Sequence, residues 1–168
     1  MVEADTKQET AKNTLLVTGG TGYIGSHTIV EILETTGQLG FDRIVIVDNL
    51  CNSNQVCLER MQEITGKCQD MVVFEQVDIC DEEKMNGVFE TYGPITSVIH
   101  FAGLKAVGES CSQPLKYYEN NVGGSVVLIK AMIKNGCKSI VFSSSATLYG
   151  DQEETTEDSR ICPTNPYG

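Results

Sequence analysis

The chain has 168 residues, of which 40% are hydrophobic, and it carries a formal net charge of −11. This length suits one domain with a substantial core and is too short for two comfortable ones. The excess of acidic residues argues against nucleic acid and against an anionic membrane surface as partners. No stretch of the sequence is long and apolar enough to cross a membrane.

The cysteines and the first residues indicate a cytoplasmic protein. The seven cysteines are odd in number, none forms a CxxC pair, and only two histidines are present to help bind a metal ion. We therefore expect reduced thiols, with neither a disulfide framework nor a metal site. Residues 1–13 are polar and lack the apolar segment of a signal peptide, so we expect a disordered head before a domain that spans residues 14–168.

Short apolar runs recur at residues 15–17, 44–47, 72–74, 98–101 and 140–142. Such runs are typical of strands that are buried on both faces of a parallel sheet. Between them, residues 85–92 and 118–133 carry apolar side chains at helical spacing. This alternation predicts an α/β fold with a doubly wound parallel sheet, in which residues 113–135 form one helix. Gly123 and Gly124 inside that helix predict close backbone packing, because each costs about 1 kcal/mol relative to alanine.

A glycine-rich turn follows the first predicted strand. Gly19, Gly20, Gly22 and Gly25 satisfy both the GxGxxG and the GxxGxxG spacing, and they open a predicted helix. Glycines let a pyrophosphate approach the backbone, and the N-terminus of the helix presents free N–H groups and a positive dipole to it. The turn therefore predicts a dinucleotide site. The alternative is a tight turn without a ligand.

Acidic residues follow the second and third predicted strands. Asp48 can accept hydrogen bonds from both hydroxyls of an adenosine ribose, and its charge would repel a 2′-phosphate. This favours NAD over NADP as the cofactor, although an aspartate can also simply begin a loop. Asp78 and Ile79 occupy the equivalent place after the third strand. There the acid could contact the edge of an adenine, and the apolar neighbour could pack on its face.

The ends of the fourth and fifth predicted strands supply further polar residues. Lys105 can reach a ribose or a phosphate, and small hydroxyl side chains in residues 143–147 can reach a sugar. In open α/β sheets, ligands bind beyond the carboxyl ends of the strands. His100 lies within a strand, and we interpret it as a core residue whose hydrogen bonds are satisfied. The acidic residues between 151 and 158 indicate a solvated loop.

Together, the segments TGGTGYIGSH, VDNLCNS, HFAGLKAVGES, SSSATLYG and NPYG resemble the UDP-glucose 4-epimerases, a family of extended short-chain dehydrogenases/reductases. The resemblance runs from about residue 14 to residue 168. It implies a Rossmann-type domain with NAD as a bound cofactor. The implied reaction is the interconversion of UDP-galactose and UDP-glucose through a 4-keto intermediate, in galactose metabolism. It also implies a homodimer for a protein of full length.

The resemblance assigns roles to individual positions. The NAD contacts that it implies are Gly19, Gly22, Tyr23, Ile24, Gly25, Asp48, Asn49, Leu50, Cys51, Asn52, Asp78, Ile79, Phe101, Ala102, Gly103, Lys105 and Asn120. The substrate-facing residues are Ser145, Ala146 and Thr147, with Ser145 hydrogen-bonded at the reacting hydroxyl. Tyr167 matches the catalytic base of the family motif YxxxK.

The lysine of that motif would fall beyond residue 168. We therefore interpret the chain as a fragment, truncated before its last strands and its sugar-nucleotide domain, and we expect it to be inactive alone. Three alternatives remain open. One is another sugar-nucleotide enzyme of the same superfamily, such as a dehydratase or a decarboxylase, although SSSAT offers no carboxylate of the kind a dehydratase needs. The second is a non-catalytic NAD-binding module. The third is a structural remnant that binds no ligand.

Overall fold

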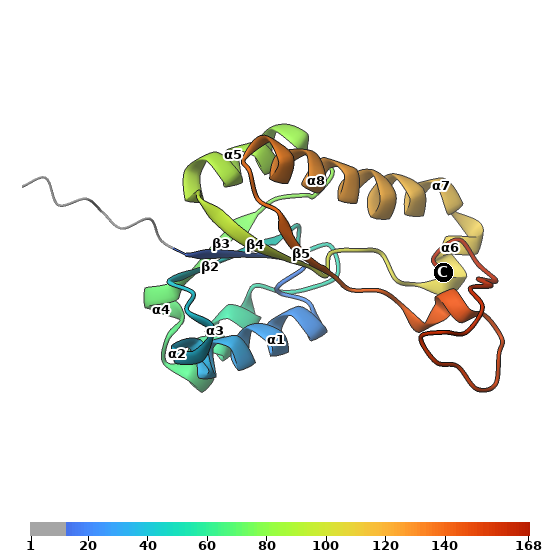
Figure 1. The fold of residues 1–168 in the computed structure, drawn as a ribbon, viewed down its shortest axis with the longest axis horizontal. Helices are drawn as coiled ribbons and strands as arrows, with labels where there is room; N and C mark the ends of the chain where they lie inside the picture. The colour runs from blue at the N-terminus through green and yellow to red at the C-terminus, as the bar shows by residue number, and fades with distance from the viewer. Residues whose placement is uncertain (1–12) are drawn as a thin grey trace, which may run out of the picture.

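The computed structural model describes residues 13–168. They form one parallel sheet in the order β3-β2-β1-β4-β5, with helices on both faces (Figure 1). The strands are β1 (Thr14–Thr18), β2 (Arg43–Asp48), β3 (Val72–Gln76), β4 (Ile95–His100) and β5 (Ser139–Phe142). The predicted head, residues 1–13, lies outside the described residues except for Asn13, which hydrogen-bonds to Asp42 and Gly40.

Two groups of helices enclose the sheet. Below it in Figure 1 lie α1 (Tyr23–Glu34), α2 (Thr36–Leu39), α3 (Val56–Thr65) and α4 (Cys68–Met71). Above it lie α5 (Glu82–Tyr92) and α8 (Gly124–Lys134). Beyond the end of the sheet lie α6 (Val107–Ser112), α7 (Pro114–Tyr117), the π-helical segment η1 (Tyr118–Gly123) and the 3₁₀ segment η2 (Ala146–Tyr149). Among residues 13–168, no helix has both the length and the apolar character needed to cross a membrane.

The strand order reverses between β1 and β4. From β1 the chain builds outward through β2 to β3, and it then returns to the other side of β1 with β4 and β5. Thr18 and His100 are register partners at the ends of β1 and β4. The loops that follow these two strands therefore leave the sheet side by side, which creates the crevice where doubly wound proteins bind their ligands. The predicted doubly wound parallel sheet is confirmed.

The side chains of β1 alternate between two cores. Leu15 and Val17 pack with residues of α1 and α3, whereas Leu16 packs with residues of α5 and α8. All three are almost completely buried. Burial of one such side chain contributes about 1.5 to 3 kcal/mol. The same alternation holds in β2, so the predicted burial on both faces is confirmed for these two strands.

The same prediction is wrong for β5, where every residue is exposed. Val141 and Phe142 are 62% and 61% exposed. Among residues 13–168, β5 lies at the edge of the sheet and pairs with β4 alone. The apolar residues of β5 resemble those of a central strand, and only the position of β5 in the sheet distinguishes it from the buried strands.

The helix α5 begins after a capping residue, Asp81. The carboxylate of Asp81 accepts a hydrogen bond from the backbone N–H of Lys84, at 3.0 Å. Such a cap contributes about 1 kcal/mol, because it satisfies an N–H that has no partner within the helix. The apolar stripe of α5 then buries Met85, Val88 and Phe89 against the core. The predicted helix over residues 85–92 is confirmed.

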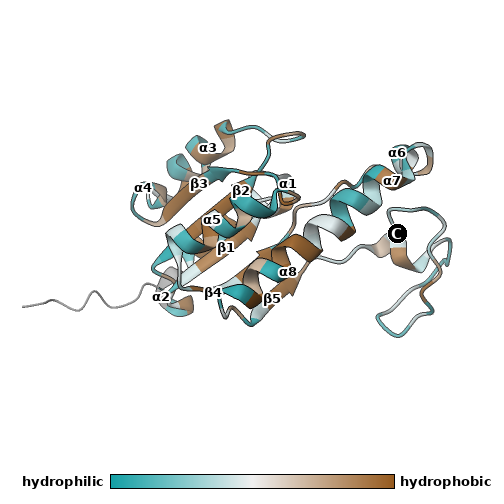
Figure 2. Ribbon diagram, turned by 90° about the horizontal axis from the view of Figure 1, so that it is seen from above, coloured by the Kyte–Doolittle hydropathy of each residue, from teal (hydrophilic) through white to brown (hydrophobic). Residues whose placement is uncertain are grey.

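The prediction of one regular helix over residues 113–135 is wrong. The chain forms the short α7, then the π-helical η1, and only then α8. The apolar stripe expected there is exposed, and the buried face of α8 consists instead of Gly124, Leu128, Ala131 and Met132. In Figure 2 the ribbon of α8 carries apolar colour over part of its length. A π segment changes the residue count per turn, so it redirects the side chains that follow it.

Gly124 confirms the predicted close packing inside this helix. A Cβ at Gly124 would lie only 2.5 Å from Cδ1 of Ile79. At Gly123 the nearest atom would be 3.9 Å away, so that glycine is not required by packing. The contact at Gly124 holds η1 and α8 against the loop that follows β3.

Candidate active site

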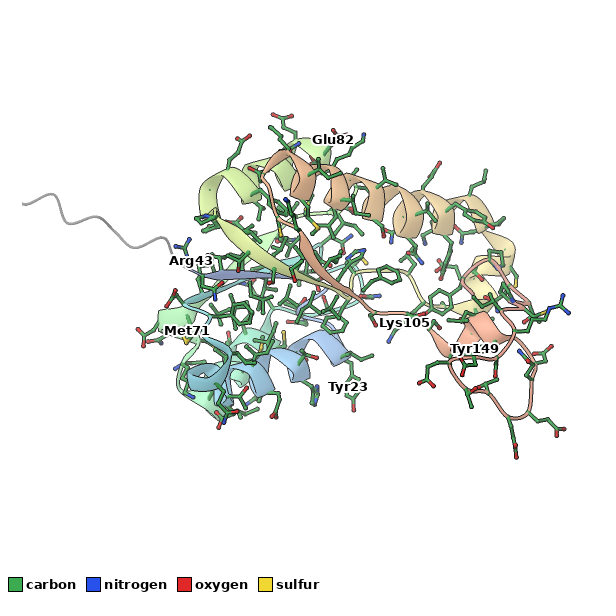
Figure 3. All side chains as sticks on the ribbon, in the orientation of Figure 1. Tyr23, Arg43, Met71, Glu82, Lys105 and Tyr149 are labelled. Atoms are coloured by element: carbon green, nitrogen blue, oxygen red, sulfur yellow. The ribbon has the colours of Figure 1, made fainter. Side chains whose placement is uncertain are left out.

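A cavity of about 1050 Å³ opens at the carboxyl ends of the strands. Its walls come from the turn after β1, the end of β2, the loops after β3, β4 and β5, the helix segments η1 and α8, and residues 163–168. In Figure 3, Tyr23, Lys105 and Tyr149 mark this end of the molecule, while Arg43 and Met71 mark the opposite end. The volume is at the upper end of the range for ligand pockets in proteins.

The glycine-rich turn forms the floor of the cavity at the start of α1. Gly19 has φ of +69°, and a Cβ there would lie 2.6 Å from the backbone nitrogen of Ala102. A Cβ at Gly25 would lie 2.3 Å from the carbonyl oxygen of Gly19. No side chain caps the first turn of α1, so its N–H groups, at Tyr23 and Ile24, are open toward an anion. The predicted phosphate-type turn is thus built as its spacing requires.

Asp48 lies at the end of β2 and is buried. Its Oδ2 accepts the N–H of Thr21, at 3.2 Å. Its Oδ1 accepts the N–H of Leu50 at 2.9 Å and the hydroxyl of Ser53 at 3.0 Å. Each carboxylate oxygen has two acceptor positions, so one position remains on Oδ2. The carboxylate therefore braces the glycine turn and still has room to accept one hydroxyl.

A second carboxylate, Asp78, stands behind the cavity wall. It accepts hydrogen bonds from the side-chain amide of Asn49, at 2.8 Å, and from the N–H of Cys80, at 2.9 Å. Burial alone would raise the pKa of Asp78, but these two hydrogen bonds outweigh it and the pKa is lowered. Asp78 thus holds Asn49 in the wall. Leu50 also lies outside the lining, in a left-handed conformation with φ of +59°.

The loop after β4 is held by an asparagine of η1. The side chain of Asn121 accepts the N–H of Leu104 and donates to the carbonyl of Leu104, both at 2.8 Å. Asn120 donates to the same Asn121 oxygen, at 2.8 Å. The π-helical turn places these two asparagines side by side on the cavity wall. This function of Asn121 could not be read from the sequence, where only Asn120 matches the family pattern.

Ser145 and Tyr167 both line the cavity. The hydroxyl of Ser145 caps η2 by accepting the N–H of Thr147, at 3.2 Å. The side-chain oxygen of Asn165 accepts the N–H groups of Tyr167 and Gly168, both at 3.1 Å. With Pro166 between them, this is the arrangement of an N-cap and the first residues of a helix.

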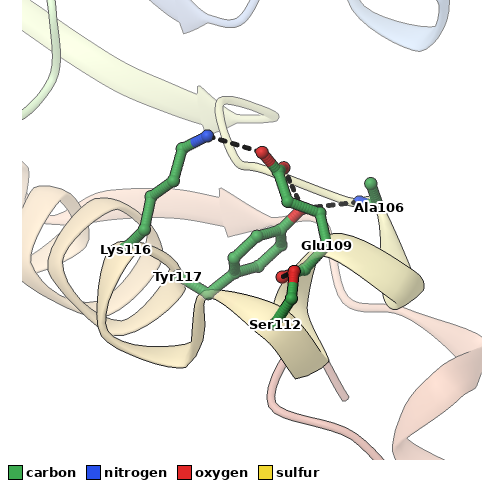
Figure 4. A network of polar contacts seen from close by, with 5 residues as sticks. All are labelled: Ala106, Glu109, Ser112, Lys116 and Tyr117. Carbon is green, nitrogen blue, oxygen red and sulfur yellow. Dashed lines mark hydrogen bonds and ion pairs between the residues drawn. The ribbon is translucent and has the colours of Figure 1, made fainter.

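A polar network supports this part of the cavity (Figure 4). The hydroxyl of the buried Tyr117 donates to Glu109, at 2.8 Å, and accepts the N–H of Ala106, at 3.0 Å. Lys116 forms an ion pair with the other oxygen of Glu109, at 2.6 Å. The hydrogen bond from Lys116 is the main reason that the pKa of Glu109 is lowered. Burial, and then the bond to Glu109, raise the pKa of Tyr117.

The structure brings most of the predicted site residues together. The predicted residues in the lining are Gly19, Gly22, Tyr23, Ile24, Gly25, Asp48, Asn49, Cys51, Asn52, Ile79, Phe101, Ala102, Gly103, Lys105, Asn120, Ser145 and Tyr167. The predicted residues outside it are Leu50, Asp78, Ala146 and Thr147. Sequence reasoning missed Tyr117, Asn121 and Ser125, which also line the cavity. Among residues 13–168, no cluster of three or more His, Cys, Asp or Glu could hold a metal ion.

A doubly wound parallel sheet with an open, glycine-built helix N-terminus and an acid after β2 defines a dinucleotide-binding domain of the Rossmann type. The chain belongs to the NAD dependent epimerase/dehydratase family, whose family model matches residues 15–168.

Similar proteins extend this assignment. The chain is 54% identical over 156 residues to the UDP-glucose 4-epimerase of Bacillus subtilis and 52% identical over 156 residues to that of Dictyostelium discoideum. Each of these two alignments covers 92% of this chain and 43% of the relative. The crystal structure of UDP-glucose 4-epimerase from Bifidobacterium longum in complex with NAD+ and UDP matches with a TM-score of 0.82 and 46% identity, over 92% of this chain and 44% of that chain. This chain therefore spans less than half the length of the relatives that it matches.

Proposed function

We propose that this sequence, in a protein as long as its relatives, interconverts UDP-galactose and UDP-glucose with NAD as a bound cofactor. We call such a protein the full-length protein. The observation that carries the proposal is that one cavity is lined by the glycine turn and Asp48 and also by Ser145 and Tyr167. The 54% identity to a UDP-glucose 4-epimerase supports the choice of substrates.

The residues present fit NAD. The open N-terminus of α1 can bind the pyrophosphate, because no Cβ obstructs it and no side chain caps it. Asp48 can accept an adenosine ribose hydroxyl at its remaining position on Oδ2. The same fixed negative charge disfavours the 2′-phosphate of NADP. Lys105 and Asn120, in the opposite wall, are proposed to contact the other half of the dinucleotide.

Inversion at C4 of a hexose breaks and remakes a C–H bond that is not acidic. When bound, NAD would accept the hydride from C4 and later return it to the same carbon. Tyr167 is proposed to remove the proton from O4 as the 4-keto sugar forms, and to return it after the sugar has turned in the site. Ser145 is proposed to hydrogen-bond O4 and so to orient it toward Tyr167. A phenol ordinarily ionises near pH 10, so a nearby cation such as the lysine of the family motif would assist.

The charge of the cavity wall disfavours a dehydratase. In the part of the lining that lies within residues 13–168, Asp48 is the one carboxylate, and it stands at the end of β2. A dehydratase needs additional acid and base groups, typically carboxylates, beside the hydroxyl residue after the fifth strand. Ser143, Ser144 and Ser145 provide hydroxyls there and no carboxylate. An epimerase needs no such carboxylate, because the proposed roles at O4 belong to the hydroxyl and the phenol.

The test is an assay of the full-length protein with UDP-galactose, in which the formation of UDP-glucose is measured. Turnover with tightly retained NAD is the expected result. Retention of NAD without turnover of either sugar nucleotide would identify a non-catalytic binding module instead. Release of water or carbon dioxide from a UDP-sugar would identify a dehydratase or a decarboxylase.

We also propose that residues 1–168 alone do not epimerise these sugars. The Tyr167 hydroxyl has no hydrogen-bond partner among residues 13–168, so little orients it for proton transfer. A base misplaced by about 1 Å can lose a hundredfold in rate. The assay above, run on residues 1–168 beside the full-length protein, tests this. Turnover by the shorter chain above that of its Tyr167→Phe variant would contradict it.

The full-length protein is further proposed to be a cytoplasmic homodimer of galactose metabolism, in which residues 14–168 form the NAD-binding domain. The support for the dimer is the resemblance to the UDP-glucose 4-epimerases; of the exposed apolar stripe, Tyr118, Val122, Val126 and Ile129 line the cavity, and Ile133 lies outside it. Light scattering of the full-length protein measures the mass. A monomeric mass at micromolar concentration would contradict the dimer.

A further inference from the structure

His100 is buried at the end of β4, with 2% of its surface exposed. Its Nδ1 lies 2.6 Å from the hydroxyl oxygen of Thr18 on β1. Its Nε2 lies 2.9 Å from the hydroxyl oxygen of Ser125 on α8. The ring therefore joins the two strands at the switch point to the helix that covers them.

The hydrogen bonds around His100 can run in only one direction when the ring is neutral. The hydroxyl of Ser125 lies 2.5 Å from the carbonyl oxygen of Asn121, and a carbonyl can only accept. The single Ser125 proton is therefore used, so Nε2 of His100 must donate to Ser125. Nδ1 is then the acceptor, and the hydroxyl of Thr18 donates to it. The hydroxyl oxygen of Thr18 in turn accepts the N–H of Ala102, at 3.3 Å.

The imidazole is held in its neutral form. Burial lowers the pKa of His100 to about 4. Among the described residues its polar contacts are the hydroxyls of Thr18 and Ser125, and its ring contact is Phe142. The neutral ring with the proton on Nε2 completes a continuous chain of donors from Ala102 to Asn121.

The two residues at the ends of this hydrogen-bond chain also hold the loop after β4. Ala102 donates its N–H to Thr18. Asn121, whose backbone carbonyl ends the hydrogen-bond chain, holds Leu104 with its side chain. The backbone of Ala102 also fits against Gly19, where a Cβ would be only 2.6 Å away. The stretch between these attachments lines the cavity. A shift of the His100 ring would therefore move the loop relative to the glycine turn.

We infer that His100 is a positioning residue for the dinucleotide site, whose ring fixes the loop Phe101–Leu104 through one directional chain of hydrogen bonds from Ala102 to Asn121. The inference rests on the proposed function, because it takes the loop to be a wall of the NAD site. A histidine that only filled the core would need neither a defined tautomer nor the hydroxyl of Thr18.

The first test is the tautomer of His100. The full-length protein is labelled with ¹⁵N at histidine, and the signals of His100 are those lost in the His100→Asn variant. Protonated Nε2 with unprotonated Nδ1 at pH 7 is the expected result. A proton on Nδ1, alone or in an imidazolium, would overturn the inference. This readout does not depend on NAD, so it stands even if the proposed function fails.

The second test is the affinity for NAD of full-length variants at Thr18. Thr18→Val keeps the shape of the side chain but removes the hydroxyl, and NAD affinity should fall about tenfold, as for one lost hydrogen bond. Thr18→Ser restores the hydroxyl and should recover most of the affinity. Thr28→Val is the control, because the hydroxyl of Thr28 bonds only to the carbonyl of Ile24 within α1. Unchanged affinity in Thr18→Val, or no recovery in Thr18→Ser, would overturn the inference. An unaltered protein that binds no NAD would refute the proposed function itself, while the tautomer would still test the hydrogen-bond chain.

Discussion

The ring of Tyr117 stands edge-on to the ring of Tyr167, with centroids 6.5 Å apart and an angle of 73° between the planes. Tyr117 is buried, and its hydroxyl is fixed by Glu109 and Ala106. Tyr167 is half-exposed at the end of the described chain. Of the two, Tyr117 is the fixed partner, so the polar network around Glu109 indirectly positions the proposed base.

Removing the Tyr117 hydroxyl should therefore impair turnover. In the full-length protein, Tyr117→Phe keeps the edge contact but frees the ring from Glu109 and Ala106, and kcat should fall about tenfold. Tyr92→Phe is the control, because it also removes a hydroxyl that donates to a carboxylate, that of Glu75, away from the cavity. Steady-state assays of both variants give the comparison. Equal losses in both would mean that only stability had changed.

The proposed base can be tested directly with Tyr167→Phe in the full-length protein. The ring still packs against Tyr117, but no oxygen remains to take the O4 proton. We expect kcat to fall by about 10³-fold, with NAD retained. Tyr149→Phe is the control, because Tyr149 lies in η2 outside the cavity lining. Near-normal conversion of UDP-galactose by Tyr167→Phe would assign the proton transfer to another group.

Gly19 and Gly40 form a matched pair, because both have φ of +69° and only Gly19 is crowded. Gly40→Ala introduces a side chain into a left-handed conformation with open space around it and should cost about 1 to 2 kcal/mol. Gly19→Ala adds a collision with the backbone of Ala102, so the free energy of unfolding should fall by roughly 3 to 5 kcal/mol. Chemical denaturation of both variants measures the difference. Similar losses would show that the loop after β4 yields easily.

How much of the fold and of the site the sequence predicts depends on how far apart in the sequence the interacting residues lie. The strands and the glycine turn can be predicted, because they depend on the periodicity and spacing of neighbouring residues. The exposure of β5 cannot be predicted in this way, because Val141 belongs to an apolar run like those of the core strands but lies at the edge of the sheet formed by residues 13–168. The His100 chain also could not be read, since Thr18, His100 and Ser125 come from three separate elements. The interpretation of His100 as a satisfied core residue is confirmed, but its partners lie on β1 and α8, which the sequence does not place beside it.

The cofactor preference tests Asp48. The full-length protein, stripped of cofactor, should bind NAD at least tenfold more tightly than NADP, because the Asp48 carboxylate opposes a 2′-phosphate. Asp48→Asn removes this charge and should narrow the preference. Asp70→Asn is the control, since Asp70 is a carboxylate in α4 and lies outside the cavity lining. Calorimetric titration with both nucleotides measures the ratio. Equal or tighter binding of NADP by the unaltered protein would refute the role of Asp48.

The buried His100 predicts a specific pH dependence of stability. Its pKa is about 4 in the folded state and 6.5 ordinarily, so between these values the unfolded chain binds the additional proton. The stabilisation is therefore complete above pH 6.5 and is lost as the pH falls toward 4, by about 3 kcal/mol in all. His100→Gln lacks this titration, so its free energy of unfolding should fall less steeply over the same range. Denaturant titrations at pH 4.5, 5.5, 6.5 and 7.5 compare the two proteins. Parallel curves for His100→Gln and the unaltered protein would show that folding does not lower the pKa of His100, which would contradict the prediction.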